Sequence, residues 1–169
     1  VAEKLGLTIE EVDAICGPFL GRPRSAAFRL NDLVGLDIMQ DIANNLRERC
    51  PHDPHAQALG TPSSMAFLLE NGWIGNKAGQ GYYRKEGQEF FSFDLVTHAY
   101  RMRQEPNLPT LDELAKQPLG PRLREALLRR DQVGDFLRAY LVPALQYAHT
   151  LREEISYHVQ DFDRVMKWG

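Results

Sequence analysis

Glycines on both sides of a lysine form the first segment whose residue types and spacing could do chemistry. Gly75, Gly79 and Gly81 flank Asn76 and Lys77, an arrangement that can hold a phosphate group on backbone N–H groups. The spacing matches neither G-x-G-x-x-G nor G-x-x-x-x-G-K-[ST], and no strand is expected before it. Because glycine is required wherever φ is positive, the pattern favours a structural turn that feeds a hairpin. A contact of Asn76 or Lys77 with a ligand or a neighbouring domain stays open.

Charged side chains gather a little after the start of the chain. Arg22, Arg24 and Arg29 make a local basic cluster that suits phosphate oxygens, although a solvated or carboxylate-paired surface is the commoner arrangement. Asp32 lies among apolar neighbours, which indicates partial burial. It is either a catalytic carboxylate or a structural one that accepts backbone N–H bonds, and the structural interpretation is favoured.

Histidines and serines offer no catalytic centre in this sequence. His52 and His55 flank Asp53, but no third strong ligand has the spacing of a metal site, so no metal is expected. No serine has the surroundings of a nucleophile elbow. The sequence therefore predicts no catalytic residue of its own.

Composition excludes several classes of protein. The 169 residues carry a net charge of -3, which gives no electrostatic footprint for nucleic acid. No apolar run approaches the ~18 residues of a membrane helix. Cys16 and Cys50 lack C-x-x-C spacing, so a disulfide scaffold and a zinc knuckle are disfavoured and we expect a cytoplasmic location. The chain begins at Val1 and stops at Gly169, directly after an amphipathic run, so we interpret it as a fragment.

The elements that must position these residues are mostly helices. Pro143 lies inside one of them and predicts a kink there. Short β runs at 82–84 and 89–93 predict a hairpin, and residues 50–62 and 94–110 are expected to be irregular. Apolar spacing and stop signals predict helices over 9–16, 25–49 (two helices or one with a kink), 63–71, 111–117, 122–129, 133–151 and from about 160 onward.

Capping signals set the expected helix starts. Residues 8–11 and 110–113 indicate capping boxes. Ser25 is the expected cap of the next helix, and Ser63 or Ser64 that of the helix over 63–71. A weak internal repeat also relates residues 8–16 to residues 158–166, although a match of this length can arise by chance.

Two segments carry a family resemblance. Residues 21–37 (GRPRSAAFRLNDLVGLD) look like part of the C-terminal domain of 3-hydroxyacyl-CoA dehydrogenases, and residues 71–83 (NGWIGNKAGQGYY) resemble that domain's second signature. Residues 136–147 followed by 159–169 look like the opening of a second copy, which gives the weak repeat a reason. The resemblance implies an all-α domain of the 6-phosphogluconate-dehydrogenase C-terminal-like type with one small β-hairpin.

The resemblance also divides the chain. Residues 1–93 would be a first C-terminal domain that lacks its opening helix, 94–132 a linker with short helices, and 133–169 the start of a second, truncated copy. The missing helix would leave apolar residues uncovered, so we expect the 133–151 helix to pack back on the first copy, within one chain or by exchange in a dimer, with the dimer favoured. The side chains expected to do this are Phe136, Leu137, Tyr140, Leu141 and Leu145.

In the family that the chain resembles, the NAD-binding glycine loop and the Ser, His and Glu of catalysis lie in a Rossmann domain, which is absent here. The family's catalytic Asn lies on the first helix of the first copy. In the second copy, the position that corresponds to this Asn is near Arg138. In the first copy, the corresponding position lies before Val1. The resemblance thus implies a substrate-cleft and dimerisation fragment of an NAD-dependent 3-hydroxyacyl-CoA dehydrogenase of fatty-acid β-oxidation, inactive alone and without a cofactor of its own.

The partners that the resemblance implies are the Rossmann domain of the same parent chain, acyl-CoA and a possible homodimer, with no nucleic acid and no membrane span. Within the two signatures, Arg29, Asp32, Asn76 and Lys77 are the candidate contacts to ligand or partner domain. The alternative is a free-standing helical interaction module that shares the fold without catalysis. A Rossmann glycine loop encoded upstream of Val1 would favour the first interpretation, and a start codon near Val1 the second.

Overall fold

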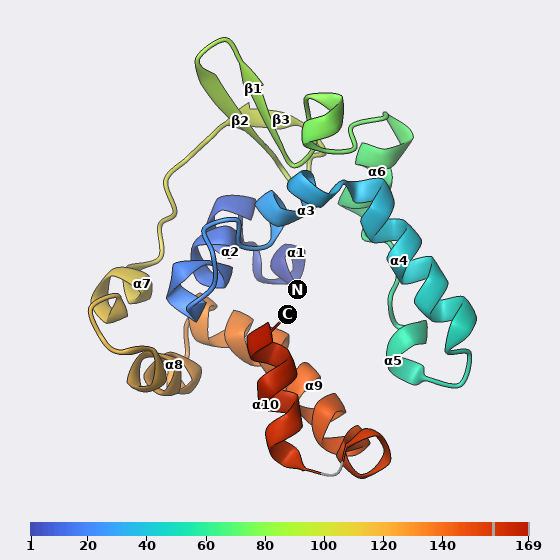
Figure 1. The fold of residues 1–169 in the computed structure, drawn as a ribbon. Coiled ribbons are helices and arrows are strands. Elements are labelled where there is room, and N and C mark those ends of the chain that lie inside the picture. Colours follow the sequence, from blue (N-terminus) through green and yellow to red (C-terminus); the bar gives the residue numbers. More distant parts are fainter. Residues whose placement is uncertain (157, 169) are drawn as a thin grey trace.

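The computed structural model describes residues 1–156 and 158–168, and the predicted predominantly helical fold is confirmed (Figure 1). Short 3-10 turns, η1 (Pro18–Leu20) and η2 (Asn76–Ala78), interrupt the connections, and β1 (Tyr83–Glu86), β2 (Glu89–Phe93) and β3 (Tyr100–Met102) form an antiparallel sheet in that order. The α-helices are α1 (Ala2–Leu5), α2 (Ile9–Cys16), α3 (Phe28–Val34), α4 (Leu36–Arg49), α5 (Pro54–Gln57), α6 (Ser63–Glu70), α7 (Pro109–Leu114), α8 (Leu119–Leu128), α9 (Gln132–Ile155) and α10 (Val159–Trp168).

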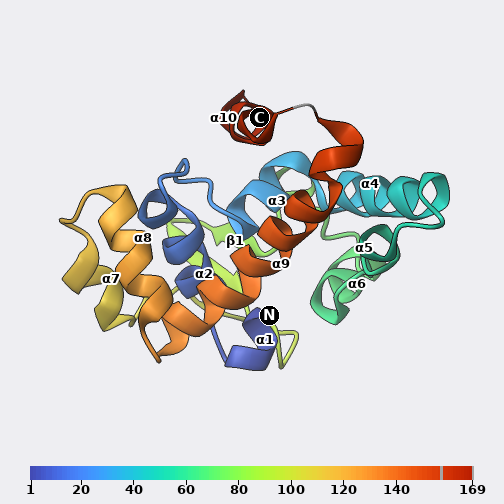
Figure 2. The same cartoon turned by 90° about the horizontal axis from the view of Figure 1, so that it is seen from below.

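Helix α2 contributes to two hydrophobic clusters and so joins the two sides of the molecule. Its Val12, Ile15 and Cys16 pack in a cluster with η1, α7, α8 and the first half of α9. Its Ile9 packs in the other cluster with side chains from α4, α6 and the sheet region. Figure 2 shows α2 between α8 and α3 accordingly. Because buried apolar surface stabilises a fold by about 25 cal/mol per Å², the side chains of α2 stabilise both clusters.

The expected break within 25–49 occurs at one glycine. Gly35 has a φ of 106°, which side-chain-bearing residues rarely adopt, and it separates α3 from α4. The segment 50–62, expected to be irregular, contains the short helix α5. Asp53 caps α5 by accepting the N–H of His55 at 2.8 Å, and Pro54 supplies the favoured first residue. An Asp-Pro pair is thus a helix start here rather than a loop signal.

One of the expected caps is confirmed and others are wrong. Thr8 accepts the Glu11 N–H, and the Glu11 carboxylate accepts the Thr8 N–H at 2.9 Å, which is the predicted capping box. The second box is wrong, because α7 already begins at Pro109 and Thr110 donates its hydroxyl to Asp131. The α6 helix begins after Pro62, so the serines that follow lie inside it instead of capping it.

Strand β3 lies in the segment 94–110 that was expected to be irregular. Arg101 on β3 donates two hydrogen bonds of 2.7 Å to the carboxylate of Glu10 on α2, and the Gln104 N–H adds a third bond of 3.0 Å. Burial alone would raise the pKa of Glu10, but these donors lower it to about 2. The strand is therefore fixed by an ion pair across the fold, which local sequence does not show.

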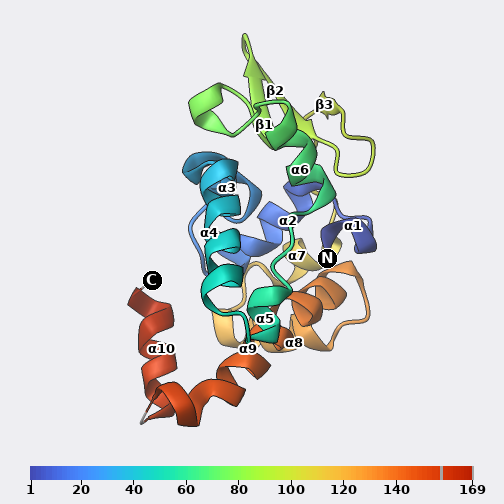
Figure 3. The same cartoon turned by 90° about the vertical axis from the view of Figure 1, so that its right-hand side faces the viewer.

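The first half of α9 packs back on the body of its own chain, which is the less favoured of the two expected arrangements. Phe136 and Leu137 are buried in the α2 cluster and Leu141 packs against it. The expectation is wrong for Leu145, which is 66% exposed, and Tyr140 lies at the boundary at 37%. Figure 3 shows α9 running away from α1 and α8 toward the end where α10 begins. Exchange between chains is not needed to bury the first half of α9.

Candidate ligand and domain-contact site

The two signature segments of the sequence meet in the structure, where the glycine loop between α6 and β1 lies against α3 and the start of α4 (Figure 1). The Leu36 N–H donates to the Ile74 carbonyl at 3.2 Å. Gly75, with a φ of 104°, approaches so closely that an added Cβ would lie 2.5 Å from the Asp32 carbonyl oxygen. A side chain at Gly75 would push the loop off α3, so the glycine is required by contact as well as by φ.

Gly79 and Gly81 serve the loop for different reasons. Gly79 has a φ of 79° and ends η2, with open space where a side chain would stand. Gly81 is not in the left-handed region, so the expected reason, a positive φ, is wrong for it. Its added Cβ would instead lie 2.2 Å from Asp32 Oδ1 and 2.7 Å from Gly75 Cα. The absence of a side chain at Gly81 therefore lets the loop lie directly against the Asp32 carboxylate.

Asp32 is the anchor beneath the loop. Its side chain is buried, and Oδ1 and Oδ2 accept the N–H groups of Tyr82 and Tyr83, each at 2.8 Å. Burial raises the pKa of Asp32 to about 6 although these two donors oppose the shift. Only 1% of Asp32 is exposed, so its side chain is not available to a ligand or a partner domain. The expectation that Asp32 makes such a contact is therefore wrong.

Asp13 is a second anchor that the sequence reasoning missed. From α2 it accepts the N–H groups of Ala27, Phe28 and Arg29 at 3.0, 2.7 and 3.0 Å, and so caps α3 where Ser25 was expected to do so. It also accepts the Tyr83 hydroxyl at 2.8 Å, and burial raises its pKa. Its partners lie 14 or more residues away, so no local pattern points to it.

Arg29, Asn76 and Lys77 lie on the surface above these anchors. An Arg29 N–H donates to Asn76 Oδ1 at 3.1 Å, and Lys77 Nζ pairs with Asp37 Oδ2 at 2.6 Å. The Lys77 ammonium beside it lowers the pKa of Asp37. The surface combines two cations, an amide and one carboxylate, a set able to bind an anionic group or a polar face of another domain.

Four backbone donors of the glycine loop are used inside the loop. The N–H groups of Gly75, Ala78, Gly79 and Gly81 donate to carbonyls of residues 75–83, at 2.8 to 3.0 Å. Donors already used inside the loop cannot surround a phosphate. The cationic side chains that an anion at this surface would meet are those of Arg29 and Lys77.

The basic cluster does not converge on this surface as a whole: Arg29 lies on it, but Arg22 has a partner elsewhere. Arg22 donates instead to the Tyr140 hydroxyl on α9 at 2.7 Å. His55 stacks near Tyr147, and Asp53 caps α5. Across residues 1–156 and 158–168 no group of three or more potential ligands is placed to hold a metal ion. Among the same residues, no helix combines the length and apolar character needed to cross a membrane.

An exposed apolar face adjoins the Arg29 and Lys77 surface. We call it the α3–α4 face; its side chains are between 41% and 53% exposed. The expected packing of the 133–151 helix on the first copy leaves these side chains exposed. Exposed apolar side chains on two consecutive helices are typical of a surface that packs against another domain. The face consists of Leu30, Leu33, Val34, Ile38, Ile42 and Leu46.

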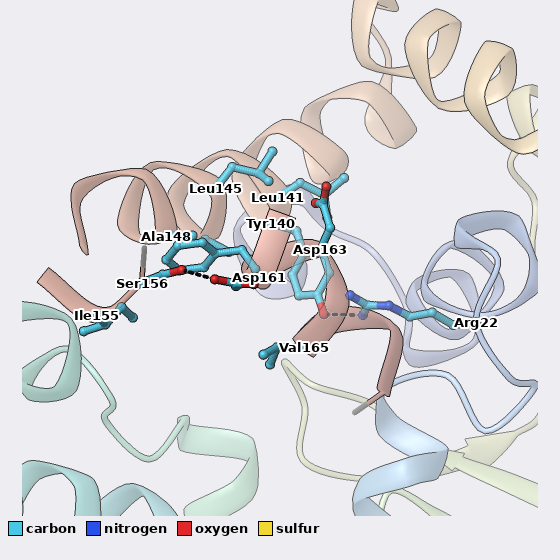
Figure 4. Close-up of a pocket in the computed structure, with 12 residues that line it drawn as sticks. Arg22, Tyr140, Leu141, Leu145, Ala148, Ile155, Ser156, Asp161, Asp163 and Val165 are labelled. Carbon is cyan, nitrogen blue, oxygen red and sulfur yellow. Dashed lines mark hydrogen bonds between the residues drawn. The ribbon is translucent and has the colours of Figure 1, made fainter. Parts of the chain in front are cut away.

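A separate cavity of about 590 Å³ lies between α9 and α10 (Figure 4), and Arg22 of the first signature segment is among the residues that line it. Tyr140 and Leu141 line it from the first half of α9, and Leu145 from the second half. Phe162 and Val165 line it from α10. Arg22 reaches its edge through the hydrogen bond to Tyr140.

Comparisons with known proteins agree with the placement of the signatures. Residues 1–85 match the family model described as 3-hydroxyacyl-CoA dehydrogenase, C-terminal domain. The chain is 39% identical over 168 residues to a probable 3-hydroxyacyl-CoA dehydrogenase of Bacillus subtilis, covering 98% of this chain and 21% of the relative.

Two further relatives are more distant or shorter matches. A probable 3-hydroxyacyl-CoA dehydrogenase of Deinococcus radiodurans is 40% identical over 87 residues, which are 52% of this chain and 24% of the relative. A putative fatty acid oxidation complex trifunctional enzyme of Rickettsia prowazekii is 24% identical over 174 residues, covering the whole chain and 22% of the relative. The chain thus spans about a fifth to a quarter of the length of these curated relatives. No solved structure matches it.

Proposed function

From the premise that the chain belongs to the 3-hydroxyacyl-CoA dehydrogenase family through its C-terminal domain, we propose that it is the helical side of the substrate cleft of a longer NAD-dependent enzyme. The parent reaction would transfer hydride from C3 of a 3-hydroxyacyl-CoA to NAD in fatty-acid β-oxidation. One observation carries the proposal: the two signature segments, distant in sequence, meet in one exposed surface with Arg29, Asn76 and Lys77.

NAD does not fit as a group that these residues hold by themselves. The N–H groups of Gly75, Ala78, Gly79 and Gly81 donate to carbonyls of residues 75–83, and the chain contains no G-x-G-x-x-G segment. We therefore assign the dinucleotide, and the catalytic groups, to a Rossmann domain of the parent chain. The part proposed for Arg29, Asn76 and Lys77 is to contact the bound ligand or that domain across the cleft.

The α3–α4 face is the proposed contact with the partner domain. It begins next to the Arg29 and Lys77 surface, because Asp37, which pairs with Lys77, is followed directly by Ile38 of the face. A homodimer is the other occupant the family resemblance implies. Light scattering separates the two: a mass of 19.3 kDa for the pure chain leaves the face to the partner domain. A doubled mass that returns to 19.3 kDa in the variant Ile42→Asp assigns it to a second copy. The proposed location is cytoplasmic.

The pure chain is expected to produce no NADH from 3-hydroxybutyryl-CoA and NAD. The reason is that the proposal places the dinucleotide-binding loop and the catalytic groups, the general base among them, in the Rossmann domain of the parent chain. A characterised 3-hydroxyacyl-CoA dehydrogenase serves as the positive control in the same absorbance assay. Turnover by the pure chain near the typical enzyme value of ~10 per second would contradict the proposal.

The gene upstream of Val1 tests the proposal independently. An in-frame Rossmann segment with a dinucleotide glycine loop supports a part of a longer dehydrogenase. A start codon at or near Val1 contradicts it and leaves the free-standing helical interaction module.

The stability of the chain is expected to peak in mildly acidic solution. Glu10 has a pKa near 2 instead of 4.5, so its stabilisation is complete above about pH 4.5 and is lost as the pH falls toward 2. Asp32 has a pKa near 6 instead of 3.8, so its carboxyl group binds a proton more tightly in the folded chain than in the unfolded chain. Its contribution is present below 3.8 and is lost as the pH rises through 6.

Melting temperatures measured between pH 3 and pH 8 check both signs. Glu10→Gln should flatten the acid side of the profile, and Asp32→Asn should flatten the decline toward neutral pH. If Asp32→Asn has the same profile as the parent between pH 4 and pH 7, Asp32 does not have a raised pKa in the folded chain.

A further inference from the structure

Helix α9 has two halves with different surroundings. In the first half, Val133 and Leu137 are buried in the core cluster. After Pro143 the helix leaves the core, and Leu145 is 66% exposed. Proline has no N–H, so the Ala139 carbonyl lacks its usual helical donor at this point. The helix is therefore weakest in its hydrogen bonding just where its burial ends.

Beyond Pro143, the side chain of Tyr147 ties α9 to the α4–α5 segment. The Tyr147 hydroxyl donates to Asp53 Oδ2, and the Tyr147 ring lies 4.3 Å, centroid to centroid, from the His55 ring. Figure 3 shows α5 next to this part of α9. The hydroxyl donor holds the pKa of the Asp53 carboxyl below its usual range, so the acceptor stays charged at neutral pH.

The receiving segment is itself held in place. Asp53 Oδ1 accepts the N–H groups of His55 and Ala56 at 2.8 and 3.3 Å, which leaves Oδ2 for the tyrosine. The Gln57 side chain donates to the Arg47 carbonyl at 2.9 Å and the Cys50 carbonyl at 3.3 Å, and so ties α5 to the end of α4. The tyrosine thus meets a positioned carboxylate and ring.

We propose that Tyr147 is a conformational latch that fastens the second half of α9, and with it α10, to the Asp53–His55 segment, with Pro143 as the hinge. The cavity between α9 and α10 is lined from both sides of this hinge, by Tyr140 before it and by Leu145 after it. Releasing the latch therefore changes the shape of that cavity (Figure 4). This inference does not depend on the proposed function.

Hydrogen–deuterium exchange of the full 169-residue chain, read by mass spectrometry, tests the latch. Tyr147→Phe removes only the hydroxyl, and Asp53→Asn removes the charged acceptor while an asparagine still caps α5. Each is expected to speed exchange over residues 144–155 by roughly five- to tenfold, and to leave residues 132–141 unchanged, because only the second half of α9 opens. Tyr147→Ala, which also removes the ring contact, should have a larger effect on the same residues.

Tyr140→Phe is the matched control. It removes a tyrosine hydroxyl from the same helix, on the buried side of the hinge, where that hydroxyl pairs with Arg22 instead. It should leave exchange over 144–155 as in the parent. The latch is overturned if Tyr147→Phe and Asp53→Asn leave this segment unchanged. Unprotected exchange of the segment in the parent chain would overturn it as well.

Discussion

Replacing Gly81 by valine is expected to lower the free energy of unfolding by about 3–5 kcal/mol. The added Cβ would lie 2.2 Å from Asp32 Oδ1 and 2.7 Å from the Gly75 Cα, so either the carboxylate or the loop must move. Moving the carboxylate breaks its bonds to the Tyr82 and Tyr83 N–H groups and leaves a buried charge short of donors. Moving the loop instead takes Asn76 and Lys77 away from α3. Urea denaturation followed by circular dichroism measures the loss.

Valine substitutions at two other glycines separate the effect of steric overlap on stability from the effect of backbone strain. Gly60→Val is the matched control, because Gly60 has an ordinary φ and no atom within 4 Å of an added Cβ, so the change should stay within about 0.5 kcal/mol. Gly79→Val has open space but a φ of 79°, so it should cost about 1–2 kcal/mol through backbone strain alone. If Gly81→Val costs no more than Gly60→Val, the close approach to Asp32 is not what holds the loop.

The sequence predicts those parts of the fold whose cause is local. The Thr8 capping box spans four residues, and the break at Gly35 follows from one glycine between two apolar runs; both are present. The errors occur where the partner is remote. The cap of α3 comes from Asp13, and β3 is fixed by the Glu10–Arg101 pair. Periodicity shows which face of α2 is apolar, but not that Glu10 and Asp13 have partners from distant parts of the chain.

In the candidate site, too, the sequence identifies some residues and misses one whose partners are remote. Residue types and the two signatures select Arg29, Asn76 and Lys77, and the structure brings these three together. Asp13 was missed because an aspartate on an amphipathic helix is indistinguishable in sequence from a solvated one. Its four donors come from α3, the residue before α3, and β1, so only the assembled fold gives it a role.

Leu137→Ala is expected to lower the free energy of unfolding by about 3–4 kcal/mol, because it removes a fully buried side chain and leaves a cavity that the surrounding helices cannot close. The leucine packs in the cluster built around α2, so the loss reports whether α9 belongs to the same cooperative unit as residues 1–93. This matters because the family resemblance assigns α9 to a second domain copy. That copy can pack on the first copy either within one chain or by exchange in a dimer.

Leu145→Ala, two turns further along the same helix, is the matched control. Its side chain is 66% exposed, so truncation should change stability by less than about 0.5 kcal/mol. Both variants are measured by urea denaturation at two protein concentrations, since burial within one chain makes the Leu137→Ala effect independent of concentration and burial by exchange between chains does not. Equal small effects of the two substitutions would show that α9 is not part of the core. A Leu137→Ala effect that grows with dilution would show that the core is completed by a second chain.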